Sequence, residues 1–141
     1  MKNVLVLCTG NSCRSIMAEA LINHFAGEHF MAVSAGSFPA GYVHPGSLET
    51  LRRHHIPVEQ PRSKSWDEFA DAHFDLVITV CDEAAAEVCP IVDGSYKRLH
   101  WSTPDPAHAE GGEVEQHEAF EFAYHQLKSR IEDELKRLYP R

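Results

Sequence analysis

Two continuous apolar runs constrain the fold of this chain more than any other feature. Residues 3–7 read Asn-Val-Leu-Val-Leu and residues 75–80 read Asp-Leu-Val-Ile-Thr-Val, without the alternation of a half-exposed strand. Such runs are typical of central strands in a parallel sheet that is covered on both faces. Parallel strands need long crossover connections, which are usually helices. We therefore expect an α/β fold.

The segments around these runs fit that architecture. Helical spacing of apolar residues predicts helices over residues 16–25, 44–54 and 113–138, with shorter ones at 65–69 and 84–88. Further strands are expected at residues 30–34 and 98–101. The alternation predicts about four mostly parallel strands, with helices on both faces and right-handed crossovers. At 43% hydrophobic residues, the 141 residues are expected to form a single domain spanning residues 1–141.

The charge and the apolar segments exclude several classes of partner. A net charge of −8 disfavours binding to nucleic acid or to an anionic membrane. The N-terminal apolar run at residues 4–7 is too short for a signal peptide, and no segment approaches the roughly 20 residues of a membrane span. We expect a cytoplasmic protein without a nucleic-acid or membrane partner.

The loop after the first predicted strand, residues 8–14, has the composition of an anion-binding site. Gly10 and Asn11 tolerate left-handed backbone angles, with which successive N–H groups form an anion-binding concavity at a helix N-terminus. Arg14 adds a planar fork that matches a tetrahedral oxyanion. We call residues 8–14 the cradle loop. The residues expected to bind the substrate are Thr9, Gly10, Asn11, Ser12, Cys13 and Arg14.

Cys8, directly after the strand, is the predicted nucleophile. The positive environment of the loop is expected to lower the pKa of its thiol, and the Ser15 hydroxyl could hydrogen-bond the sulfur. A simpler interpretation treats Cys8 and Cys13 as small buried apolar residues. A structural zinc site is disfavoured because the gaps between the four cysteines do not resemble C-x-x-C pairs. The ten histidines show no ligand spacing, so we predict no metal ligand and no cofactor.

A cysteine separated by five residues from an Arg-Ser pair, between a strand and a helix, resembles the low-molecular-weight protein tyrosine phosphatase family. The resemblance covers nearly the whole chain. It includes residues 17–20, residues 34–37, the His44-Pro45 pair and the Asp105-Pro106 pair. In that family the aspartate before proline is the general acid, which implies this role for Asp105.

A second pair of cysteines separates two branches of the family. Cys81 follows the predicted strand at residues 75–80, and Cys89 lies beyond a short predicted helix. A phosphatase needs no such pair, whereas the segment resembles that of the arsenate reductases with this fold. Reduction of As(V) to As(III) takes two electrons, which two thiols supply by forming a disulfide. The resemblance implies that Cys8 attacks arsenate, that Cys81 resolves the adduct, and that Cys89 passes the disulfide to an external dithiol protein.

Two features depart from the best-known reductases of this type. Some thioredoxin-coupled members hold a potassium ion with Asn, Glu, Ser and Asp. Here Asn11, Glu19 and Ser34 match, but Lys64 stands in place of the Asp. An ammonium group is therefore a candidate to replace the cation. The gap between the second pair of cysteines is one residue longer, which leaves open glutaredoxin with glutathione as the reductant instead of thioredoxin.

These observations predict an arsenate reductase of arsenic detoxification, acting through Cys8, Arg14, Ser15, Cys81, Cys89 and Asp105 on arsenate or phosphate oxyanions. The first alternative is a tyrosine phosphatase that hydrolyses phosphate monoesters through a Cys8-phosphate intermediate. Residues 107–108, Ala-His, disfavour it because the family's phosphatases usually have a Tyr pair there. The second alternative is a non-catalytic thiol redox sensor or oxyanion-binding module.

Overall fold

The computed structural model describes residues 1–11, 13–58, 61–69, 72–80, 97–108 and 110–138. Its centre is a sheet of four strands in the order β2-β1-β3-β4, with every neighbouring pair parallel. The strands are β1 (Lys2–Leu7), β2 (Phe30–Ala35), β3 (Leu76–Thr79) and β4 (Lys97–His100). The predicted parallel α/β sheet is confirmed.

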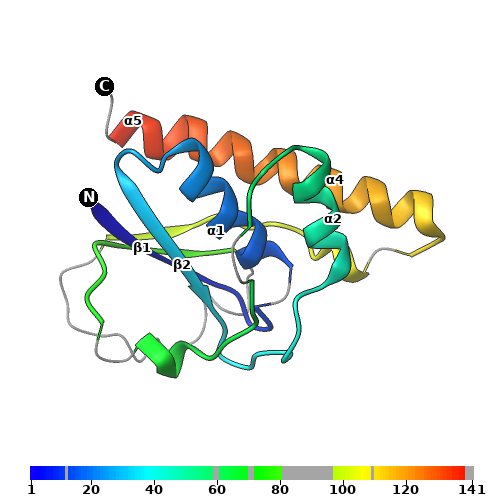
Figure 1. The fold of residues 1–141 in the computed structure, drawn as a ribbon, viewed down its shortest axis with the longest axis horizontal. Coiled ribbons are helices and arrows are strands. Elements are labelled where there is room, and N and C mark those ends of the chain that lie inside the picture. Colours follow the sequence, from blue (N-terminus) through cyan, green and yellow to red (C-terminus); the bar gives the residue numbers. More distant parts are fainter. Residues whose placement is uncertain (12, 59–60, 70–71, 81–96, 109, 139–141) are drawn as a thin grey trace.

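Three longer helices pack against one another on one side of the sheet (Figure 1). They are α1 (Arg14–Phe25), α2 (Pro45–Arg53) and α4 (Glu113–Arg130). Helix α4 continues through the π-helical η3 (Ile131–Leu135) into α5 (Lys136–Leu138). Two single turns of 3-10 helix, η1 (Trp66–Phe69) and η2 (Pro106–His108), complete the described elements. In Figure 1, η1 lies away from α1 and α4.

The core lies on both faces of the two central strands. All four residues of β3, and residues 4–7 of β1, are buried. Successive side chains of a strand point to opposite faces, so continuous burial means that both faces are covered. The apolar runs therefore form the central strands that their composition predicts.

The apolar stripe of the C-terminal helix is buried as its spacing predicts. Its members are Phe120, Tyr124, Leu127, Ile131 and Leu135. The structure differs from the predicted uninterrupted α-helix in its wider π-helical turn at the end of the stripe. The last three members are spaced by four residues, more than the 3.6 of an α-helical turn, and a wider turn keeps them on the buried side.

The candidate site is expected at the edge of the sheet where the strands end. Parallel strands deliver their carboxyl ends to the same edge, where open α/β folds build their sites. The Val80 N–H donates to the Leu7 carbonyl (3.0 Å) at that edge. Ser12, Cys81, Cys89 and the predicted helix at residues 84–88 lie outside the described residues. Among the described residues, no helix is long and apolar enough to cross a membrane.

Candidate active site

The cradle loop connects the end of β1 to the start of α1. Cys8 follows β1 directly, and Cys13 is the N-cap residue that precedes α1. Asn11 adopts the left-handed conformation predicted for this loop (φ 48°), whereas Gly10 has no positive φ. Cys8 and Cys13 are both buried, with 2% and 3% of their surface exposed, so the predicted nucleophile lies at the bottom of the loop.

Hydrogen bonds from a neighbouring segment, residues 37–41, hold the outer side of the loop. The Thr9 carbonyl accepts from the Phe38 N–H (2.9 Å), and the Gly10 carbonyl accepts from the Ala40 N–H (2.8 Å). The C=O and N–H of one planar trans peptide point in opposite directions. The N–H groups of Gly10 and Asn11 therefore point to the other side, as an anion-binding loop requires.

Gly36 lets the segment after β2 approach the cradle loop closely. A Cβ atom at this position would lie 2.5 Å from the Thr9 carbonyl oxygen and 2.8 Å from that of Cys8. The backbone of Gly36 also accepts from the Trp66 N–H (3.0 Å) and donates to the Lys64 carbonyl (2.9 Å). The residue is therefore required by close packing of three backbone segments.

The Asn11 side chain fixes the loop from within. Its Nδ2 donates to the Ser15 Oγ (2.8 Å), and its Oδ1 accepts from the Lys64 backbone N–H (2.8 Å). Asn11 and Ser15 are fully buried. These bonds connect the left-handed turn to the first turn of α1 and to the segment at residue 64.

Arg14 and Asp105, far apart in the sequence, meet at this site. The Arg14 Nη1 donates to the Thr103 carbonyl (3.0 Å), and its Nη2 lies 3.6 Å from the Asp105 Oδ2. The other carboxylate oxygen of Asp105 accepts from the Ala107 N–H (3.0 Å) at the start of η2. The Arg14 Nε is buried and has no hydrogen-bond partner among the described residues. A buried donor without a protein partner fits an oxyanion ligand.

Lys64 lies under the cradle loop, among the residues matched to a potassium site. Its Nζ is 3.8 Å from the Glu19 Oε1, 3.5 Å from the Ser34 Oγ and 3.2 Å from the Arg62 carbonyl. Burial raises the pKa of Glu19, and burial also lowers the pKa of Lys64, with their mutual attraction opposing both shifts. The ammonium group supplies the positive charge itself, so these residues do not fit a bound monovalent cation.

The structure thus brings together the described members of the predicted site around one sheet edge. Sequence reasoning missed two of its supports. One is the Thr103 carbonyl that holds Arg14, and the other is the segment at residues 37–41 behind the loop. Both act through backbone atoms, which carry no signal in residue identity. At Gly36, the only sequence signal of the close packing is the glycine itself.

The geometry agrees with the comparison to known families. A family model described as "Low molecular weight phosphotyrosine protein phosphatase" matches residues 3–141. The chain belongs to this family.

Several known proteins resemble the chain over most of its length. An arsenate reductase of Bacillus licheniformis is 37% identical over 130 residues, which are 92% of each protein. A solved structure described as "An arsenate reductase in the phosphate binding state" has a TM-score of 0.81 and 25% identity, covering 97% of this chain and 98% of the other. A thioredoxin-dependent arsenate reductase of Corynebacterium glutamicum has a TM-score of 0.69 and 28% identity, covering 94% of this chain and 61% of that one.

Proposed function

We propose that this family member reduces arsenate to arsenite and regenerates its thiols with an external dithiol protein. The observation that carries the proposal is the hydrogen bond between Val80 and Leu7 (3.0 Å). These residues directly precede Cys81 and Cys8 in the sequence, so two adjacent strands lead into these two cysteines. In the proposed mechanism, Cys8 and Cys81 form the first of two disulfides. The arsenate reductases among the relatives support the same activity.

The first step joins arsenate to the enzyme. The oxyanion binds at the N–H groups of the cradle loop and at the Arg14 guanidinium, whose Nε has no protein partner among the described residues. The Cys8 thiolate attacks arsenic, and a hydroxyl group of arsenate leaves as water after Asp105 donates one proton to it. The position of the Asp105 Oδ2, 3.6 Å from the Arg14 Nη2, supports this role. The product is a Cys8-arseno adduct that still contains As(V).

The second step reduces arsenic. The Cys81 thiolate attacks the sulfur of Cys8, a Cys8-Cys81 disulfide forms, and the electron pair of the S–As bond stays on arsenic. Arsenite leaves as As(III), having gained the two electrons that the two sulfurs lost. Cys89 then attacks the sulfur of Cys81, which frees the Cys8 thiolate and leaves a Cys81-Cys89 disulfide.

The reductant that closes the cycle is a dithiol protein, which reduces the Cys81-Cys89 disulfide by thiol-disulfide exchange. The Corynebacterium glutamicum neighbour, which is described as thioredoxin-dependent, favours thioredoxin. Glutaredoxin with glutathione remains the alternative reductant, and parallel assays with the two systems distinguish them.

Phosphate monoester hydrolysis is the second candidate activity. The cradle loop, Arg14 and Asp105 would bind a phosphate group as they bind arsenate, because both are tetrahedral oxyanions of similar charge. A Cys8-phosphate intermediate would then be hydrolysed by water without Cys81 or Cys89. We propose this as a residual activity of the same site.

A single-turnover experiment with Cys89→Ser tests the relay. We expect one equivalent of arsenite per enzyme, after which turnover stops with Cys8 joined to Cys81. Peptide mapping by mass spectrometry under non-reducing conditions detects this bridge, and the parent enzyme, in which the relay is complete, serves as the control. A Cys89→Ser variant that turns over continuously with thioredoxin at the parent rate would contradict the role of Cys89.

A further inference from the structure

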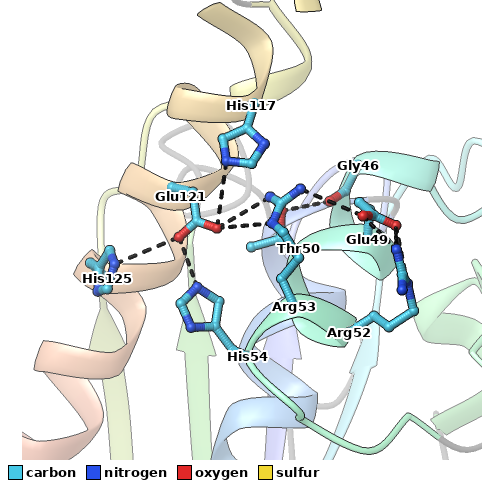
Figure 2. A network of polar contacts seen from close by, with 9 residues as sticks. All are labelled: Gly46, Glu49, Thr50, Arg52, Arg53, His54, His117, Glu121 and His125. Carbon is cyan, nitrogen blue, oxygen red and sulfur yellow. Dashed lines mark hydrogen bonds and ion pairs between the residues drawn. The ribbon is translucent and has the colours of Figure 1, made fainter. Parts of the chain in front are cut away.

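Three histidines surround one carboxylate on the far side of the helical layer from the sheet (Figure 2). The Glu121 carboxylate of α4 lies within 4.0 Å of a ring nitrogen of each of His54, His117 and His125. The His54 Nε2 lies 2.7 Å from the Glu121 Oε2, and the His125 Nε2 lies 3.7 Å from the same oxygen. The His117 Nε2 is 4.0 Å from the Oε1. None of these residues belongs to the candidate active site.

The sequence positions part of this cluster, although the spacing of the histidines predicts no metal ligand among them. His117, Glu121 and His125 are spaced by four residues, which places them on one side of α4. His54 comes from another element, at the end of α2. Its ring stacks on the Tyr124 ring, with centroids 3.8 Å apart and planes 10° apart. The stacking holds the His54 imidazole with its Nε2 toward the carboxylate.

Two of the histidines and one carboxylate oxygen form a ligand set. The ligand atoms of His54, Glu121 and His125 all lie within 4.8 Å of one another. Imidazole nitrogens with a carboxylate oxygen are the preferred ligands of zinc and neighbouring divalent metals. His125 is 63% exposed in its side chain, so its ring can rotate to close the remaining distance.

We propose that His54, Glu121 and His125 bind a divalent first-row transition-metal ion that links the end of α2 to α4. Each imidazole binds through Nε2 as the neutral ring with its proton on Nδ1, so bonds to the metal replace the hydrogen bond between His54 and Glu121. The remaining coordination positions belong to water.

One carboxylate oxygen of Glu121 is left for a bound cation. Arg53 contacts only the Oε1 of Glu121 (3.2 Å), and Glu49 lies 3.7 Å from the same guanidinium. The Oε2 thus remains directed to His54 and His125. Burial raises the pKa of Glu121, but hydrogen bonds from His54 and Arg53 outweigh it and hold the pKa below the ordinary value. The carboxylate is therefore ionised at neutral pH.

Co²⁺ binding to the reduced full-length protein tests the site. Cobalt bound to nitrogen and oxygen lacks the strong charge-transfer absorption of cobalt bound to thiolate, so the spectrum separates this cluster from the cysteines. Titration calorimetry gives the affinity, and thermal unfolding with and without Co²⁺ gives the stabilisation. The variants are Glu121→Gln and His125→Ala. The matched control is His29→Ala, an exposed histidine outside the cluster.

We expect one Co²⁺ per chain without thiolate absorption, and a higher unfolding temperature in its presence. His125→Ala should weaken binding by at least about tenfold, because the change removes a direct ligand. His125 is exposed, so this variant should retain the parent's circular dichroism spectrum. His29→Ala should bind as the parent does. Equal Co²⁺ affinity in the parent, Glu121→Gln and His125→Ala would overturn the proposal, as would thiolate absorption alone or no binding.

Discussion

Arg14 combines two tasks in one guanidinium group. Its Nη1 donates to the Thr103 carbonyl (3.0 Å), which fixes the plane of the fork against the segment that carries Asp105. Its Nη2 faces the Asp105 carboxylate (3.6 Å). The Nε remains for a ligand. A lysine has the same charge, but its three donors share one nitrogen, so it cannot reproduce the planar fork that holds Thr103 and an oxyanion at separate nitrogens.

Arg14→Lys is therefore expected to lower kcat/KM for arsenate by about 10²-fold, the usual loss when a donor to a transition-state oxyanion is removed. Steady-state assays with a thiol reductant measure this change. Arg52→Lys, on the exposed side of α2, is the matched control and should keep the parent activity. An Arg14→Lys enzyme with near-parent kcat/KM would refute the role of the guanidinium fork.

Lys64 offsets the cost of burying the Glu19 carboxylate. Burial raises the pKa of Glu19, so the folded protein disfavours its charged form, and the nearby ammonium opposes this effect. Lys64→Ala should lower the free energy of unfolding by about 1–3 kcal/mol near pH 8, where Glu19 is charged and loses its partner. As the pH falls through the raised pKa, Glu19 takes up a proton and the loss should shrink.

Urea unfolding of parent and Lys64→Ala at a series of pH values measures this dependence. Lys97→Ala, on the exposed edge of β4, controls for the loss of a positive charge. A loss at Lys64 that does not shrink as the pH falls through the raised pKa of Glu19 would show that the ammonium acts only through its bonds to Ser34 and Arg62.

The segment after β2 acts as a support for the cradle loop. Residues 37–41 hold the Thr9 and Gly10 carbonyls, and this contact depends on the close approach at Gly36. Since the N–H groups of the loop point opposite to these carbonyls, any shift of the segment changes the anion-binding geometry. The support therefore couples the packing of β2 to substrate binding.

Gly36→Ala should destabilise the protein by about 1–3 kcal/mol, because its Cβ would overlap backbone oxygens that cannot rotate away. It should also raise the KM for arsenate. Urea unfolding and steady-state kinetics measure the two effects. Gly112→Ala, where a Cβ would make only ordinary contact, should leave the KM unchanged. A Gly36→Ala protein with parent stability and KM would disprove the support.

The whole site is assembled at the carboxyl edge of one parallel sheet. β1 leads into the cradle loop, β2 into Gly36, β3 toward residue 80, and β4 toward Thr103 and Asp105. Each strand is fixed by buried neighbours, so residues from distant parts of the sequence keep constant relative positions. The sheet thus supplies the rigid frame, and four loops supply the chemistry.

Much of this assembly could be predicted from the sequence because it depends on side-chain identity. The runs at residues 3–7 and 75–80 specify central strands, and Cys8, Arg14 and Asp105 carry recognisable chemistry. The rest depends on backbone atoms or on contacts between elements. No pattern predicts that Asn11 rather than Gly10 takes the left-handed conformation, or that His54 of one helix meets Glu121 of another.

The most direct test of the proposed function compares two activities of one variant. Cys81→Ser cannot complete the first disulfide, because a hydroxyl does not replace a thiol in this step. We expect it to lose arsenate turnover with thioredoxin and its reductase, while slow hydrolysis of an aryl phosphate without reductant stays near the parent rate. Arsenate reduction by Cys81→Ser at the parent rate would contradict the three-cysteine mechanism and leave the phosphatase activity as the better account.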